Sequence, residues 1–447
     1  MTRKLFGTDG VRGRANSYPM TADMALKLAA AAGRYFRKDQ KEHRVVIGKD
    51  TRRSSYMFEY AMTGGFTSTG MNVFLLGPVP TPAVGMLTRS MRADVGVMIS
   101  ASHNPHHDNG IKFFGPDGYK LSDTAEAEIE ELVMGEIDLA KPENIGSAKR
   151  IDDALGRYIE FAKTAFPNQN LLNGLKVVVD CANGAAYKAA PIVLWELGAE
   201  VITVGVTPNG FNINDGCGST YPDTAAEAVV AHGADVGICL DGDADRLMLI
   251  DEKGQVADGD QIMGLIAQKW ASEGRLANNT LVATVMSNMG LEKHMEAQGL
   301  NMLRTNVGDR YVVQAMREGG FNLGGEQSGH IVMRDFVTTG DGLIAGLQFL
   351  GALVQSGKKA SELARVFEPY PQILENVRYG DGADPMDSAI VKQAIADGEA
   401  ALAKNGRLLI RKSGTEPLVR VMGECEDAGL LKQVITDIAG AVRAAAR

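Results

Sequence analysis

The chain has 447 residues, more than one hydrophobic core usually supports, so we expect two to four domains. Its formal net charge is −9 and it contains no long run of basic residues, which argues against a nucleic-acid-binding surface. No apolar segment is long enough to span a membrane, and the polar segment 1–14 does not resemble a secretory signal. We therefore expect a cytoplasmic protein without membrane or nucleic-acid partners, whose cysteines are free thiols.

Strand-like and helix-like segments alternate along most of the chain. A helix is predicted at 21–37, because apolar residues such as Leu28 and Ala32 recur on one face. Short apolar runs predict buried strands, and these lie at 45–48, 73–76, 95–99 and 111–114. Alternation of this kind is typical of α/β domains whose sheets are covered on both faces.

Polar or proline-rich stretches near 150, at 251–260 and at 367–371 divide the chain into four expected domains. Their bounds are 1–150, 151–255, 256–368 and 369–447. The second domain is predicted to contain strands at 175–180, 200–205, 235–240 and 247–250. The third is predicted to contain helices at 260–271 and 309–317, a strand at 281–286 and a short strand at 321–323. The last domain is predicted to contain strands at 373–378 and on both sides of 413–415, and a helix at 387–403. A second helix is predicted at the end of the chain, because apolar residues recur there at helical spacing: Leu431, Val434, Ile435, Ile438 and Val442. This pattern predicts three similar mixed α/β sandwich domains and a smaller α+β C-terminal domain.

A polar loop, Ser-Ala-Ser-His-Asn-Pro, follows the predicted strand 95–99 and places Ser102 near its tip. A serine hydroxyl is a poor nucleophile unless a base or a metal activates it. His103 and Lys112 would supply positive charge to a phosphate bound at this loop. By itself, however, the loop fits an Asn-Gly turn with a capping serine better.

Three carboxylates, Asp241, Asp243 and Asp245, alternate along the segment that follows another apolar run. Such spacing directs several hard oxygen ligands at one point and suits Mg²⁺ or Ca²⁺. An EF-hand is disfavoured, because Arg246 stands where that loop needs glycine and the flanking segments are strand-like. A solvated acidic turn is the other interpretation, and it is weakened by the position of the segment at a strand end, where α/β domains bind ligands.

Two further loops carry polar groups suited to a sugar phosphate. In Gly-Glu-Gln-Ser-Gly-His, Glu326 and Ser328 would face the same way on an extended segment and bind vicinal hydroxyls, and His330 would move a proton. A glycine-rich turn with a surface glutamate is the alternative. A later loop suits a phosphate, with a basic hairpin as the alternative, and its candidate ligands are Arg411, Ser413, Gly414 and Thr415. The glycine-rich segment 6–13 adds Arg12.

The four motifs together resemble the α-D-phosphohexomutase family. They occur in family order, one in each expected domain: Ser-His-Asn-Pro, Asp-Gly-Asp-Ala-Asp-Arg, Gly-Glu-x-Ser-Gly-His and Arg-x-Ser-Gly-Thr-Glu-Pro. The ordered set is far more specific than any one motif, and the resemblance spans nearly the whole chain. Within the family, the chain is most similar to a bacterial branch that acts on glucosamine phosphates. It has Ser100 and Gln327 where enzymes acting on mannose or glucose phosphates tend to have Thr and Met.

The resemblance implies that Ser102 is phosphorylated in the active enzyme. Mg²⁺ would be held by Asp241, Asp243, Asp245 and an oxygen of the phosphoserine. The serine would pass its phosphate to glucosamine 6-phosphate, and the resulting 1,6-bisphosphate would reorient and return its other phosphate to Ser102. Glucosamine or glucose 1,6-bisphosphate would thus serve as intermediate and activator.

The resemblance also implies roles for the remaining candidates. Glu326 and Ser328 would bind sugar hydroxyls, and the loop 411–415 would hold the phosphate that is not reacting. Charge stabilisation or proton transfer would fall to Arg12, His103, Lys112, Arg246 and His330. The family fold would be a heart-shaped, four-domain molecule around a central cleft that a mobile last domain closes.

Other interpretations stay open at this point. The same chemistry would serve mannose or glucose phosphates, a phosphorylated residue beside Mg²⁺ would also serve a phosphatase, and a non-catalytic sugar-phosphate sensor would show no turnover. The resemblance is compatible with a monomer or a homodimer. It leaves a kinase or autophosphorylation as the route by which Ser102 first acquires its phosphate.

Overall fold

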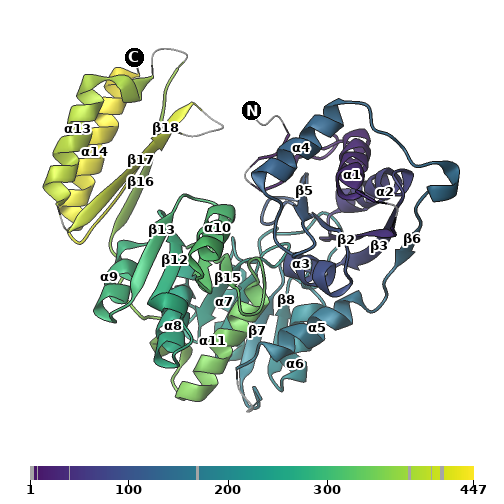
Figure 1. Ribbon diagram of the computed structural model, residues 1–447. Coiled ribbons are helices and arrows are strands. Elements are labelled where there is room, and N and C mark those ends of the chain that lie inside the picture. Colours follow the sequence, from purple (N-terminus) through teal and green to yellow (C-terminus); the bar gives the residue numbers. More distant parts are fainter. Residues whose placement is uncertain are drawn as a thin grey trace. The chain divides into compact units, whose positions relative to one another are not determined.

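The computed structural model describes residues 5–7, 9–39, 41–167, 171–380, 384–403, 405–412 and 417–446 (Figure 1). The chain forms two compact units. The first comprises Met1–Thr284 and Met302–Val366, and the second comprises Val285–Asn301 and Phe367–Arg447.

The first sheet has six strands in the order β1-β5-β4-β2-β3-β6. Strands β4, β2, β3 and β6 are parallel, whereas β5 is antiparallel to both of its neighbours. The strands are β1 (Val11–Arg14), β2 (His43–Lys49), β3 (Met71–Pro78), β4 (Val95–Ile99), β5 (Asp108–Phe114) and β6 (Ala148–Arg150). The helices of this region are α1 (Ala22–Phe36), α2 (Arg53–Ser68), α3 (Thr81–Ser90) and α4 (Asp123–Met134), with a 3₁₀ turn at Pro142–Asn144.

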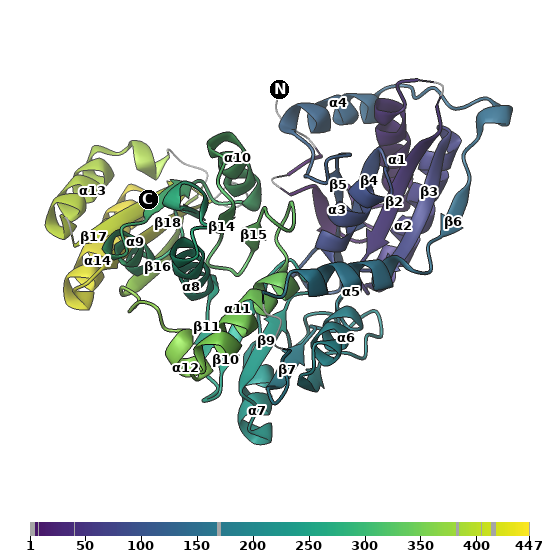
Figure 2. The same cartoon turned by 60° about the horizontal axis from the view of Figure 1, so that its bottom comes forward.

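Alternation of side chains along the strands explains why helices cover both faces of this sheet. Val45, Val73 and Val97 point to one face and belong to an apolar core that includes residues of α1, α2 and α4 (Figure 2). On the other face, Gly96 lies close enough to Val84 of α3 that a Cβ atom would be 3.2 Å from it. The predicted helix and the four strands predicted in this region are confirmed, with ends that differ by up to three residues.

The second sheet has the order β11-β10-β9-β7-β8. Its parallel strands are β7 (Lys176–Asp180), β8 (Glu200–Val204) and β9 (Val236–Leu240), and β10 (Leu247–Asp251) and β11 (Val256–Ala257) complete it in antiparallel fashion. The helices are α5 (Ala154–Thr164), α6 (Ala189–Glu196) and α7 (Asp223–His232). The loop with the three aspartates therefore joins two neighbouring antiparallel strands, β9 and β10.

The third sheet has the order β13-β12-β14-β15. Its strands are β12 (Thr280–Thr284), β13 (Asn301–Thr305), β14 (Leu323–Gly325) and β15 (Ile331–Met333). The helices of this region are α8 (Gly259–Ser272), α10 (Asp309–Gly319), α11 (Gly342–Ser356) and α12 (Ala360–Leu363), with a 3₁₀ turn at Ala277–Asn279. Strand β14 begins two residues later than the predicted 321–323. Gly320 ends α10 in a left-handed conformation (φ 68°), so the chain needs Phe321 and Asn322 to turn back before it pairs.

The second unit contains the antiparallel sheet β16-β18-β17, formed by β16 (Gln372–Arg378), β17 (Gly406–Lys412) and β18 (Leu418–Cys425). Helices α13 (Ala389–Leu402) and α14 (Ala428–Ala445) pack side by side against it (Figure 1). Helix α9 (Met289–Ala297) and a 3₁₀ turn at Pro385–Asp387 also lie in this unit. The predicted apolar face of the closing helix is confirmed, since all five of its named residues are buried.

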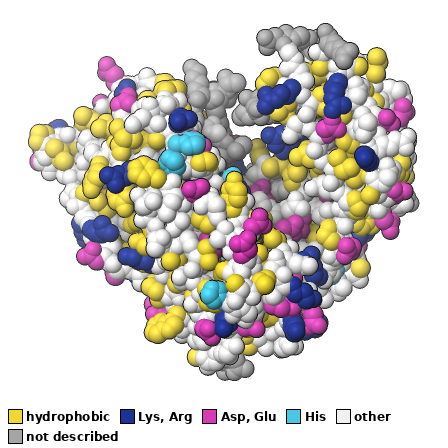
Figure 3. Space-filling view, turned by 180° about the vertical axis from the view of Figure 1, so that it is seen from behind, with side chains coloured by type: hydrophobic (Ala, Val, Ile, Leu, Met, Phe, Trp, Pro, Cys, Tyr) yellow, Lys and Arg dark blue, Asp and Glu magenta, His cyan; other side chains and the backbone are white. Residues whose placement is uncertain are grey.

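None of the described helices is both long and apolar enough to cross a bilayer. On the face shown in Figure 3, basic and acidic side chains are interspersed. The four cysteines are buried and free, as predicted.

Candidate active site

Two loops that are far apart in the sequence meet at Ser102. This residue follows β4, is 2% exposed and has a left-handed backbone conformation (φ 54°). Its hydroxyl Oγ donates a hydrogen bond of 2.5 Å to Oδ2 of Asp241, although the two residues are 139 positions apart. A non-glycine residue with positive φ is strained, and such strain collects at functional sites. The structure thus brings the predicted serine loop onto the predicted metal loop.

A buried arginine that the sequence analysis did not identify holds the serine loop. Nη2 of Arg52 donates to the carbonyl oxygens of Ser102 (2.9 Å) and Asn104 (2.8 Å), and Nε donates to Asp50 (2.7 Å). The side-chain amide of Asn214 donates to the same two carbonyls. Asp50 and Arg52 follow β2, which is parallel to β4, so their place at the same sheet edge could have been read from the sequence.

A glycine allows the metal loop to approach the serine loop. A Cβ atom on Gly242 would lie 2.6 Å from the carbonyl oxygen of Ser102 and 2.9 Å from the amide of Asn214. Only a residue without a side chain fits at this distance.

We predict that Gly242→Ala separates the two loops and lowers kcat about 100-fold, because catalytic groups displaced by about 1 Å lose that much rate. Steady-state kinetics over a range of Mg²⁺ concentrations would measure the effect. Gly156→Ala is a matched control, because Gly156 lies in α5 with nothing within 4 Å of its added Cβ atom. Equal kcat values for Gly242→Ala and the wild type would contradict the proposed close approach.

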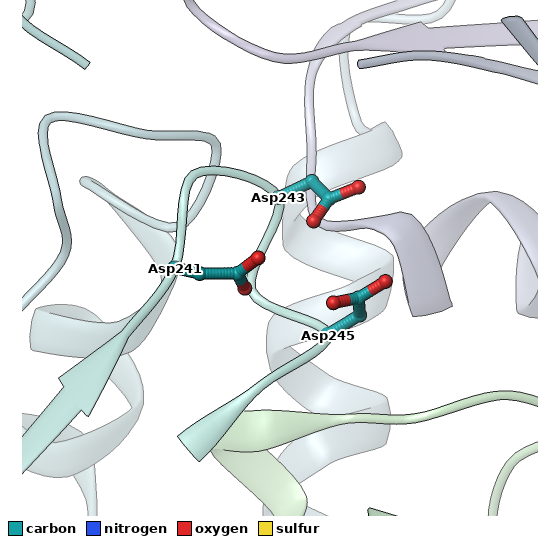
Figure 4. A group of neighbouring side chains, drawn as sticks. All are labelled: Asp241, Asp243 and Asp245. Atoms are coloured by element: carbon teal, nitrogen blue, oxygen red, sulfur yellow. The ribbon is translucent and has the colours of Figure 1, made fainter. Parts of the chain in front are cut away.

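The three aspartates of the metal loop converge as the sequence predicted (Figure 4). Asp241, Asp243 and Asp245 are buried, and one ligand oxygen of each lies within 4.8 Å of the others. Oδ1 of Asp243 and Oδ1 of Asp245 have no hydrogen-bond partner among the described residues. The Oδ1 atom of Asp245 has an ion-pair contact with His330 Nδ1 at 3.6 Å, whereas Oδ1 of Asp243 has neither kind of contact among the described residues. Three buried carboxylates with such an oxygen fit a hard divalent cation. The flanking elements are strands, so this site is not an EF-hand.

The charges around these aspartates differ from one carboxylate to the next. Burial and the neighbouring carboxylates of Asp245 and Asp243 raise the pKa of Asp241 well above its usual value. Burial alone would also raise the pKa of Asp245, but Lys112 and His330 hold it well below its usual value. A positive charge placed beside Asp241 would therefore relieve the repulsion that its carboxylate meets from its neighbours.

Lys112 lies against the metal loop and is 1% exposed. Its ammonium Nζ contacts Asp243 (2.9 Å) and Asp245 (3.4 Å). Burial would lower the pKa of Lys112, but the carboxylates of Asp243, Asp9 and Asp245 outweigh it and raise the pKa. This residue therefore keeps its positive charge inside the protein.

His103 lies beside the reactive serine. Its Nδ1 atom is 3.4 Å from Ser102 Oγ. Burial, together with the positive charges of Arg246 and Arg12, lowers the pKa of His103 to about 4. An imidazole with this pKa is neutral near pH 7 in the unphosphorylated protein.

A pocket of about 380 Å³ is lined by six of the predicted residues. Its lining includes Arg12, Ser102, Asp245, Arg246, Glu326 and His330, and also Asp9, Gly308 and Asp309, which the sequence analysis had not assigned. Because these residues come from loops of all three sheets of the first unit, the pocket depends on how those loops meet.

The sugar loop differs from the extended segment that we expected. Residues 326–329 form a turn closed by the backbone N–H of Gly329, which donates to the carbonyl of Glu326 (2.9 Å). The turn still brings the two predicted side chains together, since Ser328 Oγ donates to Glu326 Oε2 (3.3 Å). The backbone N–H of Gly308 donates to Oε1 of the same glutamate (3.0 Å).

Arg411 belongs to β17 in the second unit. Its predicted neighbours Ser413, Gly414 and Thr415 lie outside the described residues. Burial and the nearby Arg420 lower the pKa of Arg411. Two neighbouring arginines, Arg411 and Arg420, are suited to binding an anion.

Comparison with family models matches four consecutive parts of the chain. These are phosphoglucomutase/phosphomannomutase alpha/beta/alpha domain I (residues 3–138), domain II (156–254), domain III (258–370) and the C-terminal domain (374–441). The chain belongs to the phosphoglucomutase/phosphomannomutase family. Membership confirms the predicted family and fold class, and makes the chain a mutase of the isomerase class.

Relatives within this family match the chain over its full length. A phosphoglucosamine mutase of Paracoccus denitrificans is 70% identical over 447 residues, 100% of both chains. One of Dinoroseobacter shibae is 71% identical over 446 residues, again 100% of both.

Solved structures of the family share the fold at low identity. A phosphoglucomutase/phosphomannomutase family protein of Burkholderia thailandensis has a TM-score of 0.83 and 24% identity, covering 98% of this chain and 97% of its own. Aspergillus fumigatus N-acetylphosphoglucosamine mutase, solved with GlcNAc-6P and magnesium, has a TM-score of 0.69 and 20% identity, covering 100% and 96%.

Proposed function

We propose that the chain interconverts glucosamine 6-phosphate and glucosamine 1-phosphate, the reaction of a phosphoglucosamine mutase. The observation that carries this proposal is the hydroxyl of Ser102 placed 2.5 Å from Asp241, within a buried group of three carboxylates. The choice of the amino sugar is supported by relatives that are 70% identical over the full chain and bear that name. The product would feed UDP-N-acetylglucosamine and peptidoglycan synthesis in the cytoplasm.

The reaction needs one serine and two phosphoryl transfers. In the first, the bond between phosphorus and Ser102 Oγ breaks and a bond to the sugar O1 forms, which gives the 1,6-bisphosphate. After the bisphosphate reorients, the phosphoryl group on O6 returns to Ser102 Oγ and glucosamine 1-phosphate leaves. A transfer of this kind depends on positioning and charge stabilisation more than on covalent chemistry.

The residues of the metal loop would hold Mg²⁺. Asp241, Asp243 and Asp245 would bind it together with a phosphate oxygen of Ser102, and the ion when bound would neutralise charge on the transferred phosphoryl group. This assignment is supported by the convergence of the three carboxylates and by Oδ1 of Asp243, which has no hydrogen-bond partner among the described residues.

The remaining groups would bind the substrate and balance its charge. Arg12 and Arg246 line the pocket and would pair with phosphate oxygens, and Lys112 would add its buried positive charge beside the metal loop. Glu326 and Ser328, held together by a hydrogen bond, would bind sugar hydroxyls in either orientation of the bisphosphate. His103 and His330 would take part in proton transfer. The distal phosphate would be held by Arg411, Ser413, Gly414 and Thr415.

The domain organisation and the partners belong to the same proposal. We infer domains at 1–150, 151–255, 256–368 and 369–447, which the ranges of the four matching family models support. Sugar phosphates are the expected partners, with glucosamine or glucose 1,6-bisphosphate as activator. The chain would act as a monomer or a homodimer, and Ser102 would first be phosphorylated by a kinase or by autophosphorylation.

A comparison of substrates tests this function. Phosphorylated protein with Mg²⁺ is expected to show a kcat/KM for glucosamine 6-phosphate at least 100-fold above those for glucose and mannose 6-phosphates, about 3 kcal/mol of discrimination. Equal or better rates with glucose or mannose 6-phosphate would assign the enzyme to hexose-phosphate metabolism. Release of inorganic phosphate in step with substrate loss would instead indicate a phosphatase, and binding without turnover a sensor.

A further inference from the structure

A closed ring of ion pairs surrounds one side of the pocket. Three carboxylates alternate in it with two ammonium groups and one imidazole. In order around the ring, the residues are Asp9, Lys112, Asp245, His330, Asp309 and Lys120. No side chain in this ion-pair ring is more than 20% exposed. Three of its members, Asp9, Lys120 and Asp309, have no role in the function proposed above.

The contacts of the ring are direct. Lys112 Nζ is 3.3 Å from Asp9 and 3.4 Å from Asp245, and Lys120 bridges Asp9 and Asp309. His330 presents Nδ1 to Asp245 (3.6 Å) and Nε2 to Asp309 (3.4 Å). The two contacts are ion pairs only when the imidazole is protonated, and Nε2 then donates to Asp309 and does not accept from the backbone nitrogen of Gly340, which lies 3.1 Å away.

The ring joins residues of all three sheet regions of the first unit. Asp9, Lys112 and Lys120 belong to the part matched by domain I, whereas Asp245 belongs to domain II. Asp309 and His330 belong to domain III. Any shift between these regions would change the distance between Lys112 and His330, which contact Asp245 from two directions.

The charge balance of the ring indicates what the loss of one member would do. Burial would raise the pKa of Asp9, but Lys112, Lys120 and Arg12 hold it well below its usual value. Lys120 is likewise the main group that lowers the pKa of Asp309 against burial. Without Lys120, the two carboxylates would face each other with one cation fewer between them, and a buried uncompensated charge is strongly unfavourable.

We propose that Asp9, Lys120 and Asp309 are positioning residues for phosphoryl transfer, which fix the ammonium of Lys112 and the imidazole of His330 beside the metal-binding carboxylates. The proposal rests on the mutase function above. It predicts that the ring acts on the rate of the transfer step and hardly on the binding of the sugar phosphate.

The competing explanation is that the ring only ties segments of the fold together. A neighbouring set of ion pairs provides the control, because Arg310, next to Asp309 on α10, pairs with Asp123 and Glu126 of α4. These pairs link the same two regions as the bridge from Lys120 to Asp309, but they lie outside the ring. Arg310→Met should therefore loosen the regions without disturbing Lys112 or His330.

The test compares Lys120→Met, Lys120→Arg and Arg310→Met with the wild type. For each protein, the measurements are the folded fraction, kcat, KM and the single-turnover rate of phosphate transfer from labelled Ser102 to glucosamine 6-phosphate. Lys120→Met is expected to lose about 30- to 100-fold in kcat and in the single-turnover rate, with KM within threefold. Lys120→Arg keeps the positive charge, so its kcat should be at least tenfold above that of Lys120→Met. The kcat of Arg310→Met should stay within threefold of the wild type.

Several results would overturn the inference. The first is a kcat of Lys120→Met within threefold of the wild type, and the second is an equal fall of kcat in Arg310→Met. The third is an effect of Lys120→Met on KM or on the folded fraction alone. The fourth is a fall of kcat that Lys120→Arg does not relieve. Failure of the proposed mutase function would give a different result from all of these. If that function were wrong, the wild-type phosphoenzyme itself would transfer no phosphate to glucosamine 6-phosphate.

Discussion

Replacement of Ser102 by alanine is expected to abolish the mutase reaction, with kcat reduced at least about 10⁴-fold. The hydroxyl is the proposed carrier of the phosphoryl group, and its Oγ donates to Asp241 of the metal loop at 2.5 Å. The fold should survive, because Arg52 and Asn214 hold the serine loop through its backbone carbonyls and not through Oγ of Ser102. Turnover of glucosamine 6-phosphate with added glucose 1,6-bisphosphate would measure the loss.

The control for this variant is Ser90→Ala, which removes an exposed hydroxyl at the end of α3. It should keep full activity and incorporate label from ³²P-labelled bisphosphate, whereas Ser102→Ala should incorporate none. Thermal unfolding should show both variants folded. Near-normal turnover of a folded Ser102→Ala protein would mean that another group carries the phosphate, and the proposed mechanism would be wrong.

The parts of the fold that the sequence predicted well are those in which one local signal sufficed. The apolar run at 95–99 became β4, and the helical spacing of the apolar residues from Leu431 to Val442 became α14, because burial of a continuous apolar face determines both. The three aspartates also converged as predicted, since alternate residues of a tight loop between antiparallel strands have few other arrangements.

Contacts between residues that are distant along the chain could not be predicted from the sequence. Arg52 resembles any arginine at a helix start, and only the folded protein shows that its guanidinium lies against the carbonyls of the serine loop. Lys120 and Asp309 are 189 positions apart and belong to no motif. Periodicity and motifs report local structure, so pairings of this kind need the tertiary arrangement.

The predicted geometry of the sugar loop was wrong for a related reason. Alternation on an extended segment would place Glu326 and Ser328 on one face, but Gly329 (φ 88°) allows the chain to turn sharply. A Cβ atom there would lie 2.0 Å from the carbonyl oxygen of Leu247, so glycine is required by the neighbouring strand β10. The two side chains meet through the turn and not through the alternation that we expected.

Replacement of Arg52 by methionine is expected to have the second largest effect. The guanidinium is fully buried and donates to Asp50 and to the carbonyls of Ser102 and Asn104, with further contacts to Pro105 and Asp108. Methionine would leave a buried carboxylate without its cation and several carbonyl oxygens without donors. Loss of one partner of a buried ion pair costs about 3–5 kcal/mol, so urea unfolding should show a destabilisation of that size.

Activity should fall further than stability alone explains, because the same guanidinium sets the position of the serine loop. At temperatures where Arg52→Met is still folded, we expect kcat to be about 100-fold below the wild type. The adjacent Arg53, which is exposed at the first position of α2, provides the control. Arg53→Met should have the same stability in urea and the same kcat as the wild type. Arg52→Lys should be intermediate, since an ammonium restores the charge for Asp50 but cannot reach all of the carbonyls from one place. A folded Arg52→Met protein with wild-type kcat would show that Asn214 alone holds the loop.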